Sequence, residues 1–88
     1  MQQSIEVRVE IFREGDLYVG ICPELDVSSF GETIETAKQS LREAVSLFIE
    51  ECEEMGTLAE VLEEAGFTQQ DARWLPRQPV ASELVGIG

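Results

Sequence analysis

The chain has 88 residues, enough for one domain with a thin core, so self-association as a dimer or tetramer is a natural supplement to its stability. Its 18 acidic residues against 6 basic ones repel phosphate backbones, which disfavours direct nucleic-acid binding and favours a basic protein partner, although solubility explains the charge equally well. No apolar run approaches the roughly 20 residues that a membrane span needs, so we expect no membrane contact.

The first third of the chain predicts a β-hairpin. Residues 5–13 alternate apolar with charged side chains, which is the period of a strand with one buried face. After the polar link at residues 14–16, the alternation resumes in a second strand whose predicted core set is Leu17, Val19 and Ile21. Three side chains fall out of phase and predict a reverse face that the tail or a second copy of the chain covers: Phe12, Tyr18 and Cys22.

A short third strand and the start of a helix follow. Pro23 lacks an amide hydrogen and should end the second strand, and residues 27–30 predict a third strand that Gly31 closes. Thr33 can cap the next helix through its hydroxyl, while Glu32 and Glu35 place negative charge at the positive end of its dipole. The start of the helix is therefore well specified.

Residues 34–55 predict one long amphipathic helix. Its apolar residues form a stripe about 100° wide that we expect to face the sheet: Ile34, Ala37, Leu41, Ala44, Val45, Phe48, Cys52 and Met55. Gly56 stands where a left-handed cap residue is wanted. Residues 57–60 have the pattern of a capping box for a second, shorter helix, which Gly66 ends.

The remainder of the chain predicts an arm. Pro76 and Pro79 exclude helix, and residues 80–87 are rich enough in β-formers for a final strand that adds to a sheet edge in its own or a neighbouring subunit. We expect Trp74 to anchor this arm to the domain. The predicted fold is thus α+β, with a three-stranded antiparallel sheet covered by one long helix, then a short helix and a C-terminal strand or arm. Residues 1–67 form the predicted domain and residues 68–88 the arm.

Nothing in the sequence predicts an enzyme. The chain has no histidine for acid–base work, and its acids near strand ends, such as Asp16 and Asp26, have no spacing that requires them to converge on a metal. Cys22 and Cys52 fall in different predicted elements, so we expect reduced thiols and neither a metal nor a cofactor. The alternating N-terminus does not resemble a signal peptide, and we expect a cytoplasmic protein.

An acidic cluster near the end of the long helix is the candidate partner-binding site. Negative charge is disfavoured there by the helix dipole and by mutual repulsion, so a helix selected only for stability would not carry it. Leu47 stands among these acids on the helical wheel, as an apolar anchor does in a protein-binding patch. Two alternatives stay open: a solvated face, or a second helix folded over Leu47. The predicted site residues are Glu43, Leu47, Glu50, Glu51, Glu53 and Glu54.

The chain resembles the HicB-like antitoxin family over about residues 5–67. The resemblance rests on two antiparallel strands, the sequence Cys22-Pro23-Glu24-Leu25, a short polar strand, Gly31-Glu32-Thr33, and a helix containing Glu43-Ala44. It implies a reduced RNase H-like or double-stranded-RNA-binding-domain-like fold. It also implies a role, because members bind a small basic mRNA-cleaving toxin, HicA, and cover its active site.

The chain departs from the family pattern in two places. Many members carry a C-terminal DNA-binding module, for which this chain has neither the length nor the basic residues, and the loop after Pro23 lacks the Pro-Gly-Cys often seen in the family. We therefore expect an antitoxin-like protein without its own DNA-binding module. The alternative is a toxin-free homo-oligomeric structural or adaptor protein. In either case the residues predicted to form the oligomer interface are Phe12, Tyr18, Trp74, Val80 and Leu84.

Overall fold

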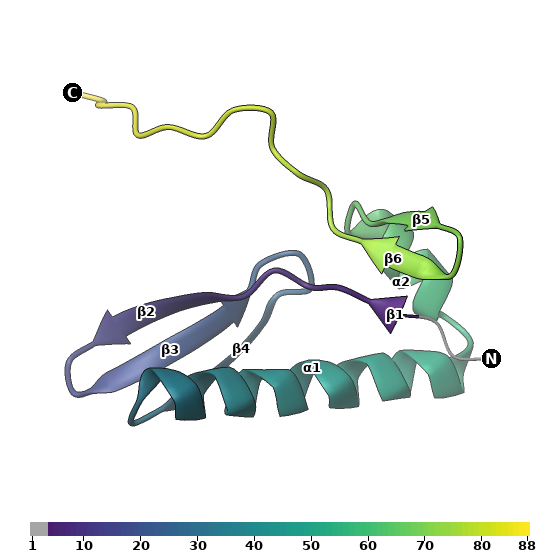
Figure 1. Ribbon diagram of the computed structural model, residues 1–88, viewed down its shortest axis with the longest axis horizontal. Coiled ribbons are helices and arrows are strands. Elements are labelled where there is room, and N and C mark those ends of the chain that lie inside the picture. Colours follow the sequence, from purple (N-terminus) through teal and green to yellow (C-terminus); the bar gives the residue numbers. More distant parts are fainter. Residues whose placement is uncertain (1–3) are drawn as a thin grey trace.

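The fold is a three-stranded antiparallel sheet lying along one long helix (Figure 1). The computed structural model describes residues 4–88, so the first three residues of the predicted domain lie outside the described residues. Strands β2 (Glu10–Glu14), β3 (Leu17–Cys22) and β4 (Val27–Gly31) pair in the order β2-β3-β4. They pack on helix α1 (Ile34–Met55), which a short helix α2 (Leu58–Glu64) follows. The predicted α+β fold is confirmed.

A second small sheet joins the start of the described chain to residues 68–75. Strand β1 (Ser4–Ile5) pairs in parallel with β6 (Arg73–Leu75), and β6 pairs antiparallel with β5 (Thr68–Gln70). The predicted strand over residues 5–13 is therefore divided, because its start pairs with β6 while its end pairs with β3, and residues 6–9 between them lie outside the strands.

The strand predicted at residues 80–87 is not formed. The C-terminal strands lie earlier, at residues 68–75, where β1 offers β6 an edge to pair with. Beyond β6, Pro76 and Pro79 lack the amide hydrogens that continued pairing needs. The rest of the chain extends away from the domain as a tail (Figure 1).

The turn between β2 and β3 decides which side chains face the helix. A two-residue loop, in which Gly15 takes a φ of 60°, pairs Glu14 with Leu17 and Ile11 with Gly20. Ile11 and Gly20 face α1, since a β-carbon on Gly20 would lie 3.2 Å from side-chain atoms of Ile11 and Leu41. By alternation, the β3 residues on this face are Tyr18, Gly20 and Cys22.

The predicted core set of β3 was therefore wrong. Leu17, Val19 and Ile21 lie on the sheet face turned away from α1, and Cys22, predicted on the reverse face, is fully buried in the core. Because side chains alternate with a period of two, an offset of one residue in the pairing exchanges the two faces of a strand. The hydrophobic alternation was correct for each strand, but the turn fixed their relative phase.

The start of α1 is held tightly against the sheet. The Thr33 hydroxyl accepts a hydrogen bond from the Thr36 amide at 3.0 Å, and the Thr36 hydroxyl accepts one from the Thr33 amide at 2.9 Å, so the predicted N-cap is confirmed. A β-carbon on Gly31 would lie 2.5 Å from the backbone nitrogen of Ala37, which leaves room only for glycine. Sheet and helix are therefore in backbone contact at this junction.

The predicted apolar stripe of α1 is confirmed in its middle and wrong at its ends. Ala37, Leu41, Val45 and Cys52 are buried, whereas Ile34 and Met55 are exposed at the two ends of the helix. A stripe buries only the residues that the neighbouring elements reach.

Gly56 and Thr57 both help to end α1, although Thr57 was predicted to begin α2. Gly56 adopts the left-handed conformation expected of a C-terminal cap, with φ 74°. Thr57 was predicted to open a capping box for α2, but its side chain makes no such bond. Its hydroxyl and its amide instead both donate to the Cys52 carbonyl, at 3.4 Å and 2.9 Å, so the side chain of Thr57 closes α1 and does not cap α2.

The core continues from the sheet under α2 and β6. Its buried residues are Cys22, Leu25, Leu41, Val45, Leu62, Phe67 and Trp74. Trp74, at 2% exposure, fixes β6 to the rest of the domain, which confirms the predicted anchor. Burying an aromatic side chain of this size stabilises the fold by about 3 kcal/mol or more, so residues 68–75 are firmly packed on the domain.

Candidate functional site

The acidic cluster predicted from the sequence lies on one exposed side of α1. We call the residues Glu43, Leu47, Glu50, Glu51, Glu53 and Glu54 the acidic end; every one of them is exposed. Five share one helical face, because they follow Glu43 at intervals of 4, 7, 8 and 11 residues. Glu53 lies about 100° away from the centre of that face. The helix thus brings together all the predicted site residues except Glu53.

Leu47 is open to solvent at the centre of this face. Its exposed fraction is 62%, so α2 does not fold over it, and that alternative is excluded. Leu47 borders a shallow groove on α1 that Arg42, Glu43 and Ser46 also line. A large apolar side chain in such a place is already exposed, so a partner can contact it without any rearrangement of the domain.

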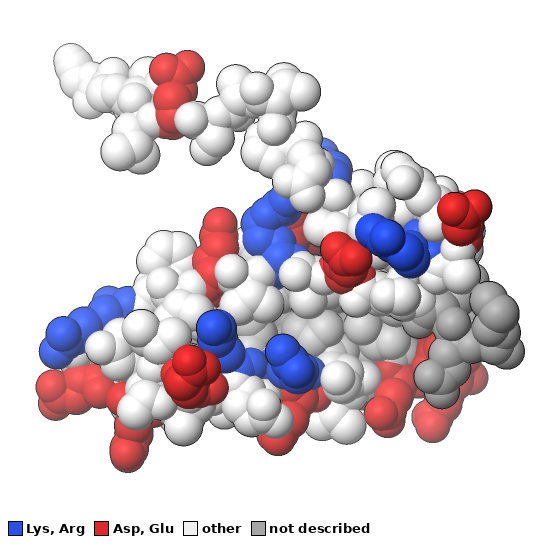
Figure 2. Space-filling view, viewed as in Figure 1, with Lys and Arg blue, Asp and Glu red and all other residues white. Residues whose placement is uncertain are grey.

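Charge is unevenly distributed along the chain. Residues 43–72 contain nine acids and no base. Within that stretch, the last turn of α1 carries no basic residue, so nothing in the helix compensates the negative end of its dipole. Figure 2 shows acidic side chains along the lower edge of the view, where α1 runs. The acidic end is therefore a surface of strongly negative potential.

Most residues that carry the family resemblance stabilise the fold of this chain. Cys22 and Leu25 are buried in the core, Gly31 permits the close approach of sheet and helix, and Thr33 caps α1. Glu24 forms an ion pair with Arg8. These residues therefore specify how the sheet meets the helix. Of the residues that carry the resemblance, Glu43 alone belongs to the acidic end.

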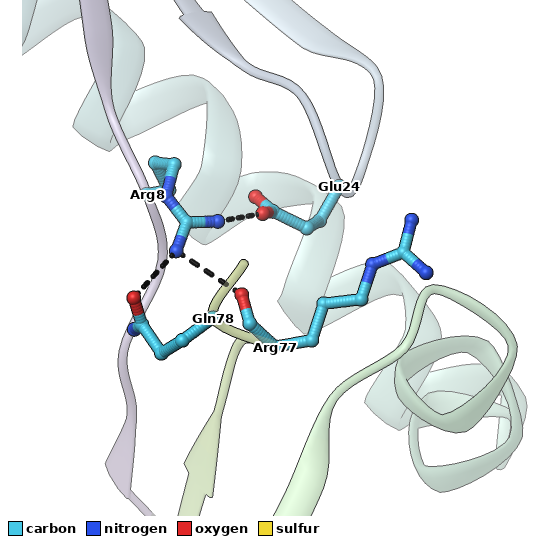
Figure 3. Close-up of polar contacts among 4 residues, drawn as sticks. All are labelled: Arg8, Glu24, Arg77 and Gln78. Atoms are coloured by element: carbon cyan, nitrogen blue, oxygen red, sulfur yellow. Dashed lines mark hydrogen bonds and ion pairs between the residues drawn. The ribbon is translucent and has the colours of Figure 1, made fainter. Parts of the chain in front are cut away.

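Arg8 links three separate segments (Figure 3). Its guanidinium pairs with Glu24 in the loop before β4, and it also donates to the Arg77 carbonyl at 3.1 Å and to the Gln78 amide oxygen at 3.2 Å. Among residues 4–88, the second carboxylate oxygen of Glu24, Oε1, is buried without a hydrogen-bond partner. This cluster holds the start of the tail against the domain.

Cys22 and Cys52 are free thiols that form no disulfide. Burial raises the pKa of the Cys22 thiol, so this side chain stays neutral and is a poor nucleophile. Cys52 is also a free, buried thiol. Within residues 4–88, no group of three or more histidine, cysteine or acidic side chains is placed to hold a metal ion.

The sheet face turned away from α1 is an apolar surface that the sequence only partly predicted. Across the three strands Phe12 pairs with Val19 and Val19 with Phe30, and Phe30 is 63% exposed. We call this surface the open sheet face; its apolar residues are Phe12, Leu17, Val19, Ile21 and Phe30. Counting across the two-residue turn would have revealed the three on β3, whereas the place of Phe30 depends on the pairing of β3 with β4.

The five residues predicted to form an oligomer interface do not lie together. Phe12 is on the open sheet face, whereas Tyr18 faces α1 and Trp74 is buried. Val80 and Leu84 are fully exposed in the tail. Only Phe12, Val80 and Leu84 therefore offer surface to another chain.

Comparison with protein-family models, with curated proteins and with solved structures found no significant match to this chain. The resemblance to HicB-like antitoxins thus rests on the sequence features given above. Among the described residues, no helix combines the length and the apolar character needed to cross a membrane.

Proposed function

We propose that this chain is an antitoxin-like protein that binds a small basic mRNA-cleaving ribonuclease through the acidic end of α1 and covers its active site. The observation that carries the proposal is the exposed Leu47, surrounded on one helical face by Glu43, Glu50, Glu51 and Glu54. Arg42 also borders Leu47, but acids predominate on this face. An apolar anchor bordered mainly by one charge is typical of a surface that recognises a partner of the opposite charge.

The chemistry of the partner follows from what it must bind. A protein that cleaves RNA holds phosphates, so its active site presents lysine and arginine side chains. Carboxylates on a rigid helix can take the positions of those phosphates, while Leu47 excludes water from the centre of the contact. Inhibition would be steric and electrostatic, with no reaction carried out by the chain.

The energetics of the free chain favour the same interpretation. Each carboxylate in the last turn of a helix costs roughly 0.3–1 kcal/mol through the dipole, and like charges four residues apart add a similar cost. Glu50 and Glu54 form such a pair. A basic partner would reduce both the unfavourable interaction with the helix dipole and the repulsion between the carboxylates. Part of the binding free energy would therefore come from removing electrostatic repulsion that is present in the free chain.

A second candidate function is a toxin-free homo-oligomeric structural or adaptor protein. The open sheet face favours it, because an apolar surface that includes Phe12 and Phe30 exceeds what scattered surface residues present. The two functions use different surfaces of the molecule, which makes them separable by mutation.

The test begins with capture of the tagged chain from its own host's lysate at low salt. Any small basic protein that co-purifies in near-stoichiometric amount is then purified and incubated with RNA, with and without the chain. We expect cleavage by that protein alone and loss of cleavage at one equivalent of chain, with activity returning at high salt because screening weakens the contact. A co-purifying protein that never cleaves RNA, or whose cleavage the chain does not reduce, would reject the proposal.

A further inference from the structure

A groove runs between the extended residues 5–9 and one side of α1. Its apolar lining includes Val7 and Val9 from the extended segment and Val45 and Ile49 from the helix. Lys38 and Arg42, one helical turn apart, line the same groove. The acidic end occupies the neighbouring side of α1, and Arg42 and Ser46 lie between the two surfaces.

The two cations of this groove lack acid partners within the chain. Arg8 and Arg73 each form an ion pair with a glutamate, whereas no ion pair among residues 4–88 involves Lys38 or Arg42. Arg13 and Arg77 likewise form no ion pair within residues 4–88, so what distinguishes Lys38 and Arg42 is their place beside an apolar groove. An apolar groove with two uncompensated cations suits an apolar segment that carries negative charge.

The tail of the chain has those properties. Residues 79–88 contain one acid, Glu83, and no base. Their large apolar side chains are all exposed: Val80, Leu84, Val85 and Ile87. Figure 2 shows acidic atoms in red and no basic ones on the tail that projects from the domain. Such a segment loses apolar contact with water only by binding to another surface.

The backbone beside the groove is also suited to an extended segment. Residues 5–9 lead into β2, and within the described chain β2 has a strand on only one side, β3. An open strand edge accepts a further strand through its main-chain groups. In an extended tail Val85 and Ile87 lie two residues apart, so their side chains share one face and can enter the groove together.

We propose that the tail of a second copy of this chain, residues 80–88, binds in the groove, with Val85 and Ile87 against its apolar lining and Glu83 near Lys38 and Arg42. The chain's own tail leaves β6 on the side of the molecule opposite α1 and projects away (Figure 1), so it leaves its own groove open. Reciprocal exchange of two tails closes a symmetric dimer.

Electrostatics favour this contact over others between two copies. Two chains of net charge −12 repel each other over most of their surfaces. The tail carries one acid and meets the two unpaired bases of α1, so this contact joins opposite charges. It goes beyond the proposed function and leaves the acidic end free for a basic partner.

The test uses a charge exchange between two variants of the full chain. The tail variant is Glu83→Lys, and the groove variant is Lys38→Glu with Arg42→Glu. Each variant places like charges together and should raise the dimer dissociation constant at least about tenfold in sedimentation equilibrium at low salt. An equimolar mixture of the two should restore a heterodimer, because each tail then meets a groove of opposite charge.

A matched control reverses two exposed bases outside the groove, Arg13→Glu with Arg73→Glu, and should retain the dimer. The emission of Trp74, the only tryptophan, reports that every variant is folded. A native chain that stays monomeric up to high concentration would overturn the proposal. A mixture of folded variants that restores nothing would also overturn it, because the tail of one copy would then not meet the groove of the other. So would a dimer that only Phe12→Ser dissociates, which would place the contact on the open sheet face.

Discussion

The two halves of α1 differ in what their sequences explain. At the start of the first half, Thr33 caps the helix and Gly31 allows it to approach the sheet closely, and within this half Leu41 is fully buried. These residues are explained by their contribution to folding. In the second half, acids crowd the unfavourable end of the dipole and Leu47 faces solvent. Folding does not require this second arrangement, although Val45 and Cys52 on the other side of the same half are buried. The difference therefore separates the buried side of the helix from the exposed acidic side that is available to a partner.

The largest expected contrast comes from truncating one leucine in each half. Leu41→Ala should lower the free energy of unfolding by about 2–5 kcal/mol, because it removes buried atoms and leaves a cavity. Leu47→Ala should change it by less than about 0.5 kcal/mol, since that side chain is mostly exposed. Urea unfolding followed by circular dichroism measures both. Comparable losses would mean that Leu47 packs against the domain and is not available to a partner.

A smaller contrast is expected between the two threonines at the helix starts. Thr33→Ala removes the side-chain acceptor for the Thr36 amide and should cost about 1 kcal/mol. Thr57→Ala removes a hydroxyl that makes no cap bond to α2 and should cost clearly less. Thermal unfolding of the two variants makes the comparison, and a larger loss for Thr57→Ala would contradict the assignment of Thr57 to the end of α1.

The smallest effects test the dipole argument by their sign. Glu54→Lys should raise the free energy of unfolding by roughly 0.3–1 kcal/mol, whereas Glu35→Lys in the first turn should lower it by a similar amount. Both effects should shrink at high salt because both sites are exposed. Denaturant titrations at two salt concentrations provide the measurement. A loss of stability on Glu54→Lys would show that the acids at this end of α1 do not destabilise the free chain.

The sequence predicted the helices, the caps at Thr33 and Gly56, and the three strands of the main sheet, because each depends on local patterning. It failed where a non-local relation decides the outcome. The phase between β2 and β3 depends on a two-residue turn, and the pairing of β1 with β6 joins residues about 70 positions apart.

The candidate site was predictable to a different extent in each part. Helical spacing alone placed Leu47 with its neighbouring acids, but whether α2 covers it required the structure. The strand–helix groove was not foreseen, because it exists only where the extended residues 5–9 lie beside α1. The tail was predicted as a strand because its composition favours one, yet a strand forms only where an edge is in reach.

The measurement that tests the central claim most directly is the affinity of two variants for the basic ribonuclease that we propose as partner, by titration calorimetry at low salt. One variant reverses Glu50, Glu51, Glu53 and Glu54 to lysine; the other reverses Glu10, Glu14, Asp16 and Glu32, which are equally exposed and lie elsewhere. Both change the net charge equally, so long-range repulsion is matched. We predict that the first variant loses binding and the second retains it. Equal affinities for the two variants would contradict the account, because general charge and not the acidic end of α1 would then govern recognition.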